Sequence, residues 1–276
     1  MSFESSRRGF LLGAGALGLA PLRGEKTNSN GDDLKLAVAS YSLRGFQRDL
    51  AIKVIKDLNV HYASIKEYHL PYNDSPKQLA DGSQKFRDAG IEVVSGGVIY
   101  LTKDDDADIR RYFDYAKACG MAMMIIGPTA ETMPRIGSFV KEYNIKVAIH
   151  NHGPEDKHFP SPQSALHIVK DMDPRCGICI DVGHAARAGS DLVESIREAG
   201  PRLFDMHIKD LRAISKEAAC PVGEGVLPIV GMFKELKKMN YAGTVSLEYE
   251  VDEDNPFTGM KASFAYMRGV LAGMRG

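Results

Sequence analysis

The stretch VAIHNHG, residues 147–153, starts as a short apolar strand and ends in two histidines that flank an asparagine. Side chains alternate between the two faces of a β-strand, so His150 and His152 share one face while Val147 and Ile149 share the other. In a parallel barrel the outward face packs on helices, and the inward face leads to the open end of the barrel. The stretch therefore predicts a barrel strand that carries two imidazoles to that end.

Seven further apolar runs alternate with longer segments of helical period along the chain. The eight strand candidates cover residues 34–41, 59–67, 91–96, 121–127, 145–150, 177–181, 203–209 and 243–250. Strands that alternate with helices are typical of βα units around a parallel sheet. Eight such units predict an α/β fold, a single-domain (β/α)₈ TIM barrel, which typically takes about 250 residues.

Helical periodicity is clearest at residues 49–58 and at residues 106–120, where Gly120 is a typical helix stop. The last helix carries an apolar stripe that we interpret as core packing: Phe257, Met260, Phe264, Met267 and Leu271. An open doubly wound sheet is the alternative architecture, but it would usually show a glycine-rich dinucleotide turn after its first strand. Within residues 34–276 neither GxGxxG nor GxxxxGK[ST] occurs, so this range is predicted to form one barrel domain.

Residues 1–33 differ in composition from the rest of the chain. Arg7 and Arg8 precede an apolar, Gly/Ala-rich stretch that is too short for an ordinary membrane span, and polar residues follow it. With Phe10 and Leu11, the arginine pair resembles the twin-arginine export signal of bacteria. The segment predicts export to the periplasm and no membrane span in the mature protein; a tail or an uncleaved anchor is the alternative.

Composition excludes some classes of partner. The chain has 276 residues, 44% of them hydrophobic and 26% charged, with a net charge of -1, which is ordinary for a soluble globular protein. Such a charge offers no basic field for nucleic acid or an acidic membrane surface. The four cysteines could pair in an exported protein, but the CGIC run at 176–179 is interpreted as buried strand packing rather than a zinc or redox motif.

The inward faces of the last four strands carry the chemistry. Each strand brings one ionisable side chain to its carboxyl end: His150, Asp181, His207 and Glu248. Two imidazoles and two carboxylates would be costly to bury without partners, and a divalent cation satisfies all four. This donor set predicts one divalent metal ion, with manganese or zinc favoured by the mixed nitrogen and oxygen ligands.

Five blocks of the sequence resemble a known family. IHNHG, IDVGHAARAG, MHIKD, VGEGVLPI and YAGTVSLEYE are similar to motifs of the xylose-isomerase-like TIM barrels, a group of sugar phosphate isomerases and epimerases and ketose epimerases that is also kin to endonuclease IV. The resemblance implies a metal held by a glutamate, an aspartate, a histidine and a second glutamate on strands five to eight. It also implies that the two glutamates serve as acid and base on opposite faces of the sugar.

Asp181, His207 and Glu248 match this ligand set, whereas His150 stands where the family usually has a glutamate. Two carboxylates then neutralise the cation where three usually do, so the metal should be a stronger Lewis acid. One of the two carboxylate bases is also missing. Epimerisation usually needs two proton-transfer groups, whereas isomerisation or β-elimination beside a ketone can use one.

Other groups near the strand ends are candidates for catalysis or substrate binding. His152, Glu67 and His184 are expected either to act on the substrate or to form structural hydrogen bonds. Lys209 could neutralise an enediolate oxygen, or it could form a salt bridge with Asp205 or Asp210.

The sequence predicts a metal-dependent isomerase or epimerase in which Glu248 removes a proton next to a carbonyl of a small sugar. Export argues against a phosphorylated substrate, which makes a lyase or hydratase acting on 3-keto-glycosides the first alternative. A catalytically silent sugar-binding barrel is a second one. A DNA repair nuclease is opposed by the neutral charge and by the export signal. The oligomeric state is left open, a homo-oligomer included.

Overall fold

The computed structural model of the protein describes residues 34–275. Eight parallel strands pair in a closed ring in the order β1, β10, β7, β6, β5, β4, β3, β2. These strands are β1 (Lys35–Ala39), β2 (Tyr62–Ile65), β3 (Glu92–Leu101), β4 (Met123–Pro128), β5 (Lys146–His150), β6 (Cys176–Asp181), β7 (Leu203–Ile208) and β10 (Thr244–Leu247). The predicted (β/α)₈ barrel is thereby confirmed.

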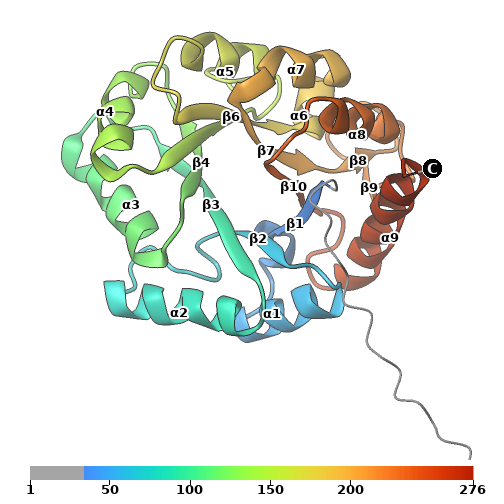
Figure 1. Ribbon diagram of the computed structural model, residues 1–276, viewed down its shortest axis with the longest axis horizontal. Helices are drawn as coiled ribbons and strands as arrows, with labels where there is room; N and C mark the ends of the chain where they lie inside the picture. The colour runs from blue at the N-terminus through green and yellow to red at the C-terminus, as the bar shows by residue number, and fades with distance from the viewer. Residues whose placement is uncertain (1–33, 276) are drawn as a thin grey trace, which may run out of the picture. The chain divides into compact units, whose positions relative to one another are not determined.

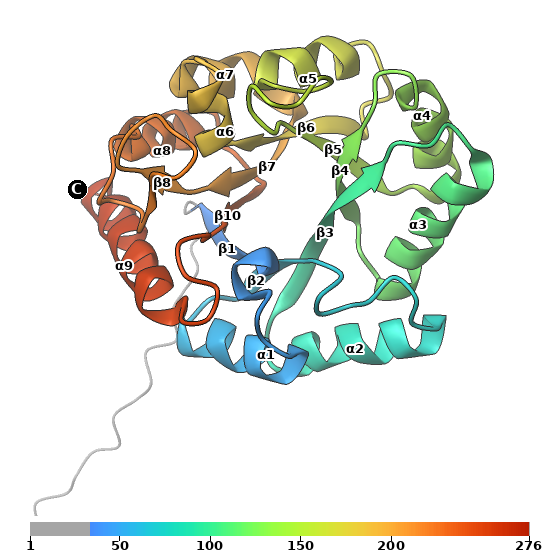
Figure 2. The same ribbon diagram turned by 180° about the vertical axis from the view of Figure 1, so that it is seen from behind.

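The α-helices lie in a ring outside the strands (Figures 1 and 2). They are α1 (Arg48–Asp57), α2 (Pro76–Asp88), α3 (Asp106–Cys119), α4 (Met133–Tyr143), α5 (Pro162–Val169), α6 (Val182–Arg187), α7 (Leu192–Ala199), α8 (Ile229–Lys238) and α9 (Phe257–Gly273). The smaller elements are the 3₁₀ turns Ser40–Leu43 and Gly200–Arg202 and the antiparallel pair β8 (Asp210–Leu211) and β9 (Ala219–Cys220).

Local signals explain where the helices begin and end. Helix α2 starts with a capping box, in which the Ser75 side chain accepts from the Gln78 amide and the Gln78 side chain accepts from the Ser75 amide. Asp105 caps α3 in the same sense by accepting from the amide of Asp108. Helix α3 ends at Gly120, whose φ of 70° lies in the left-handed region, as the sequence predicted.

Strand β3 is longer than predicted. The sequence predicts that the strand ends at Gly96, but pairing with β4 continues to Leu101 after a register shift. A Cβ atom at Gly97 would lie 2.1 Å from the carbonyl oxygen of Ile125, so glycine is needed there for close approach of the two strands. The extension brings Tyr100 to the carboxyl end of the barrel.

Two apolar layers follow from the alternation of side chains. Val147 and Ile149 belong to the large outer core between strands and helices, together with the buried residues of the α9 stripe. Ala148 and Cys179 belong to a small inner cluster inside the barrel. The inward and outward assignments for β5, β6 and β10 are confirmed by this division.

Alternation along the strand at 203–209 predicts that Phe204 points outward with Met206 and Ile208, and for Phe204 this prediction is wrong. Phe204 packs against the inner cluster, because the pairing of β6 with β7 shifts register between Ile178 and Cys179. This bulge inserts one extra residue on β7, so that Phe204 departs from the alternation that Met206 and Ile208 follow. The inward positions of Asp205 and His207 are unaffected.

All four cysteines are buried and carry free thiols. Cys176 faces the outer core and Cys179 the inner cluster, which agrees with packing inside a strand. None of the helices within residues 34–275 combines the length and the apolar character that a membrane span requires. The predicted export signal with Arg7 and Arg8 lies outside the described residues.

Candidate metal centre at the carboxyl end of the barrel

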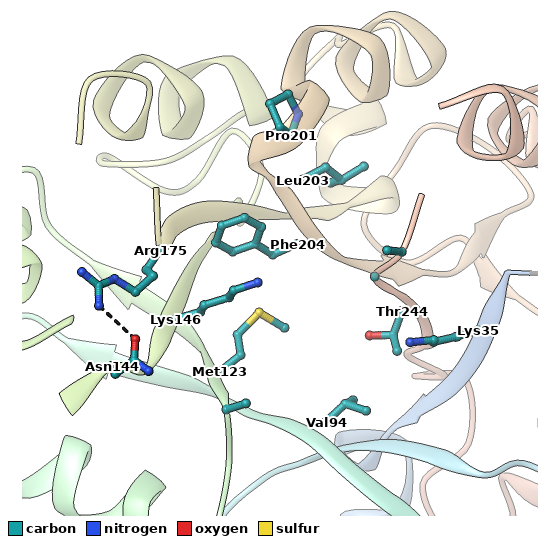
Figure 3. A pocket seen from close by; sticks show the side chains of 13 residues that line it. Lys35, Val94, Met123, Asn144, Lys146, Arg175, Pro201, Leu203, Phe204 and Thr244 are labelled. Atoms are coloured by element: carbon teal, nitrogen blue, oxygen red, sulfur yellow. Dashed lines mark hydrogen bonds between the residues drawn. The ribbon is translucent and has the colours of Figure 1, made fainter. Parts of the chain in front are cut away.

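Two cavities lie at opposite ends of the barrel. The larger one, about 540 Å³, is at the amino end, where Lys35, Lys146 and Thr244 begin their strands (Figure 3). None of the residues that line it is His, Cys, Asp or Glu. The smaller cavity, about 380 Å³, is at the carboxyl end, where (β/α)₈ barrels carry their chemistry. Its lining comprises Tyr41, Lys66, Glu67, Tyr68, Val98, Tyr100, His150, His152, His184, Glu248 and Glu250.

The four predicted metal ligands converge beside this smaller cavity, which is lined by two of them, His150 and Glu248. One ligand atom from each of the four, His150, Asp181, His207 and Glu248, lies within 4.8 Å of the others. The Nε2 atom of His150 is 3.1 Å from Nδ1 of His207 and 3.6 Å from Oδ2 of Asp181. Nδ1 of His207 is 3.4 Å from Oε1 of Glu248. All four side chains are buried, with at most 7% of any residue exposed.

These spacings fit a divalent ion. Two donors at neighbouring corners of a tetrahedron lie about 3.3–3.6 Å apart when the bonds to the metal are about 2.0–2.2 Å long. The donor types, two imidazoles and two carboxylates, are those that zinc and manganese accept. Because two imidazole nitrogens face each other, a cation between them would also remove the conflict over which nitrogen carries a proton.

The charge states of the two imidazoles differ. Burial, together with the neighbouring His152, lowers the pKa of His150 to about 3, so His150 is neutral at physiological pH. Burial would also lower the pKa of His207, but Cys179 and the Glu248 carboxylate outweigh burial and hold this pKa well above its ordinary value. A neutral His150 is ready to coordinate a metal, whereas His207 must release a proton first.

Asp181 is fixed by its neighbours as well as by its strand. Its Oδ1 atom accepts from the amide of His184 at 2.8 Å and so caps α6. Asn151, the residue after β5, binds the backbone of Asp181 through its side chain, which donates to the Asp181 carbonyl at 3.1 Å and accepts from the Asp181 amide at 2.9 Å. Asn151, the residue between the two histidines of the opening stretch, therefore sets the position of a ligand on the next strand.

Lys209 contacts the donor set, and neither predicted salt bridge of this lysine forms. Its Nζ atom lies 3.0 Å from Asp181 Oδ2, 2.9 Å from Glu248 Oε2 and 3.4 Å from Glu250 Oε2. Asp205 instead accepts from the hydroxyls of Thr244 and Ser246.

Asp210 accepts from the backbone amides of Leu211, Gly223, Gly225 and Leu227, so it organises the loop after β7.

Burial would raise the pKa of Glu248, but Lys209 and His207 outweigh burial and hold this pKa well below its ordinary value. Both oxygens of Glu248 are thus engaged by cationic groups.

His152 has the environment of a proton carrier. Its Nδ1 atom lies 3.3 Å from Oδ2 of Asp156, whose Oδ1 accepts from the amides of His158 and Phe159. Its Nε2 atom lies 3.4 Å from the Tyr100 hydroxyl beside the cavity. Burial, with the neighbouring His184, lowers the pKa of His152, which keeps its imidazole neutral. Neither Asp156 nor Tyr100 was identified from the sequence.

The remaining candidates, Glu67 and His184, line the cavity farther from the four donors. Glu67 is one-third exposed and accepts from the Tyr72 hydroxyl at 3.1 Å. The ring of His184 lies 6.0 Å from that of His150, and its Nδ1 atom is 3.1 Å from an Arg187 guanidinium nitrogen. Both residues therefore lie where a substrate could reach them, and neither belongs to the four-donor cluster.

Asp205 lies beneath the centre, fully buried, and burial raises its pKa to about 6 despite the opposing effect of His207. The carboxyl group of Asp205 therefore binds its proton more tightly in the folded protein than in the unfolded chain. Stability should therefore fall as pH rises from about 4 to about 6, by roughly 3 kcal/mol in all. We expect Asp205→Asn to lack this loss, so that its melting temperature gains on the wild type between pH 4.5 and 7.5. A constant difference across that range would contradict the raised pKa.

The fold and the donor set define a class of barrel, and sequence comparison agrees with it. The chain belongs to the xylose isomerase-like TIM barrel family, whose sequence profile matches residues 52–270. An uncharacterised protein of Methanocaldococcus jannaschii is 30% identical over 211 residues, which make up 71% of this chain and 68% of that protein. The inosose dehydratase of Mesomycoplasma hyopneumoniae is 25% identical over 163 residues, 52% of this chain and 54% of the enzyme, so this match spans about half of that relative.

Solved structures show the same fold. The IolI protein, crystallised with a bound zinc atom, matches with a TM-score of 0.73 at 16% identity and covers 87% of this chain and 99% of its own. D-psicose 3-epimerase, crystallised in the presence of D-fructose, matches with a TM-score of 0.68 at 17% identity and covers 88% and 98%. At these identities the likeness establishes the architecture of the barrel.

Proposed function

We propose that the protein is a metal-dependent isomerase or epimerase that moves a proton next to the carbonyl of a small sugar or keto-sugar. The observation that carries the proposal is that the four-donor cluster and the His152–Asp156 pair meet at one cavity, which is lined by His150, His152 and Glu248. His150, Asp181, His207 and Glu248 would hold the divalent ion. The ion, when bound, would polarise the carbonyl and stabilise negative charge on neighbouring oxygens.

We assign the proton transfer to His152 rather than to Glu248, the base expected from the sequence. Glu248 is a weak base, because Lys209 and His207 engage its two oxygens and keep its pKa low. His152 is neutral, the Asp156 carboxylate lies 3.3 Å from its Nδ1 atom, and its Nε2 atom lies beside Tyr100 of the cavity lining. Asp156 would also stabilise the imidazolium that forms when His152 accepts a proton.

A second proton carrier favours epimerisation or isomerisation. Glu67 follows β2, whereas His152 follows β5, and β3 and β4 separate the two strands in the barrel wall. A sugar held in the cavity can therefore be approached from two sides. The volume of about 380 Å³ lies in the range of about 300–1,000 Å³ typical of small-molecule sites.

A lyase that removes water next to a ketone is the second candidate function. It is favoured by the similarity to an inosose dehydratase and by His150, which leaves the donor set with fewer carboxylates than an epimerase of this family usually has. The proposed location outside the cytoplasm, based on Arg7 and Arg8, suits a free or oxidised sugar better than a phosphorylated one.

Deuterium exchange from solvent into a panel of ketoses and 3-keto-glycosides tests both candidates. Exchange without elimination would support the isomerase or epimerase. Loss of one water from a ketose, or of the glycosidic alcohol from a 3-keto-glycoside, seen by mass spectrometry, would support the lyase. We expect Asp156→Asn and His152→Ala to slow either reaction by about 100-fold or more while metal content is unchanged. His158→Ala, an exposed histidine on the same loop, is the matched control. No exchange and no elimination with any metal-loaded sample would favour a silent binding barrel.

A further inference from the structure

Lys209 is buried at the metal centre and is surrounded by carboxylates. Only 6% of the residue is exposed, and its ammonium group lies within 3.4 Å of Asp181, Glu248 and Glu250. Asp181 and Glu248 are the two anionic members of the four-donor cluster, whereas Glu250 is not a member. A permanent cation of the protein thus binds the same two carboxylates that a divalent ion would need.

The chain makes specific room for this lysine. A Cβ atom at Gly183 would lie 2.7 Å from Cδ and 2.9 Å from Cγ of Lys209. Gly183 follows Asp181 by two residues in the first turn of α6. The absence of a side chain at position 183 therefore lets the lysine stem pass beside the ligand strand and reach the donors. The position of the ammonium group therefore depends on the glycine at position 183, whereas a surface lysine needs no such space.

The contact of Lys209 with the two carboxylates changes the net charge that a metal ion meets. A histidine supplies no negative charge, so Asp181 and Glu248 supply all the negative charge of the donor set. An ammonium group about 3 Å from both carboxylates offsets part of that charge and repels a second cation. Glu250 offers the ammonium an alternative partner, and its side chain is 35% exposed.

We propose that Lys209 is a built-in competitor of the metal ion, which keeps the centre exchangeable rather than permanently loaded. Uptake of a divalent ion requires Lys209 to shift from Asp181 and Glu248 toward Glu250. Metal affinity is then set by the balance between these partners. This inference rests on the metal centre of the proposed function and adds a control of that centre by the protein itself.

Metal titration of Lys209→Met tests the competition without any measurement of turnover. With Zn²⁺ and Mn²⁺ as probes, in competition with a chelator, we expect binding about 10- to 100-fold tighter than in the wild type. Lys66→Met is the matched control, because Lys66 lines the same cavity with a 12% exposed side chain but contacts Glu67 and the Val98 carbonyl instead. The control should change affinity less than about threefold.

Two further variants keep the test decisive if Lys209→Met folds poorly. Gly183→Ala displaces the lysine stem but retains its charge, and it should also tighten binding. Glu250→Gln removes the alternative partner, and it should weaken binding several-fold. Unchanged or weaker binding in both Lys209→Met and Gly183→Ala, with the wild type still binding metal, would overturn the role of Lys209 alone. If neither the wild type nor any variant binds metal, the proposed function fails as well.

Discussion

Asp181→Ala is expected to abolish stable metal binding. The substitution removes one of the four converging donors and one of the only two carboxylates among them. The loss of affinity should exceed the roughly 10–100-fold that is typical of removing an outer partner of a metal ligand. Elemental analysis after dialysis measures it directly. His207→Ala should give the same result, because its Nδ1 atom lies between the donors of His150 and Glu248.

Asp181→Asn separates the ligand role from the structural role. Asp181 also caps α6 through the amide of His184, and loss of such a cap costs about 1 kcal/mol. Asparagine keeps an oxygen for this hydrogen bond but loses the negative charge. It should therefore retain most of the melting temperature while metal content falls. Full metal occupancy in both Asp181→Ala and His207→Ala would show that the ion, if any, binds elsewhere.

The sequence predicts the donor set because alternation along a strand is a local property. Each donor lies at or next to the carboxyl end of its strand, two positions from other inward residues, and the apolar residues between them identify the outward face. This alternation of inward and outward side chains is uninterrupted along β5, β6 and β10. On β7 it fails at Phe204, because a register shift between neighbouring strands leaves no mark in the sequence of one strand.

The partners of Lys209 could not be predicted in the same way. Alternation along β7 places Lys209 on the same face as Asp205 and His207. Asp205 lies one layer deeper, however, where it accepts hydrogen bonds from two hydroxyls of β10. The lysine instead extends across to Asp181 on one side and Glu248 on the other. Which inward residues meet depends on the stagger of strands round the barrel, a property of the closed structure.

Two residues of the site, Asp156 in a loop and Tyr100 in the extension of β3, had no periodic signal in the sequence. Asp156 meets His152 because the chain turns at Gly153, whose φ is +86°, and because two amides fix the carboxylate. Tyr100 meets the same histidine because β3 continues beyond its glycines. Both contacts come from irregular backbone, for which spacing in the sequence predicts no direction.

His150→Glu is expected to tighten metal binding and to destabilise the metal-free protein. A glutamate at position 150 raises the number of carboxylates in the donor set from two to three, so attraction for a divalent ion should grow by at least about tenfold. Without the ion, a third buried carboxylate would lie beside Asp181, at a cost on the order of 3 kcal/mol that Lys209 and His207 offset only in part. Metal affinity and the melting temperatures with Zn²⁺ and with a chelator measure both effects.

His150→Gln is the matched control, because glutamine has nearly the shape of glutamate but no charge. If His150 is a ligand, affinity should follow the order glutamate, histidine, glutamine, and the rise in melting temperature on adding Zn²⁺ should follow the same order, since tighter binding stabilises the folded state more. If His150 is only a buried structural histidine, both variants should lower the melting temperature with and without metal and leave the affinity for Zn²⁺ unchanged. Equal affinities in the three proteins would therefore remove His150 from the centre, whereas the graded order would assign to this single position the charge that distinguishes the site from the usual donor set of its family.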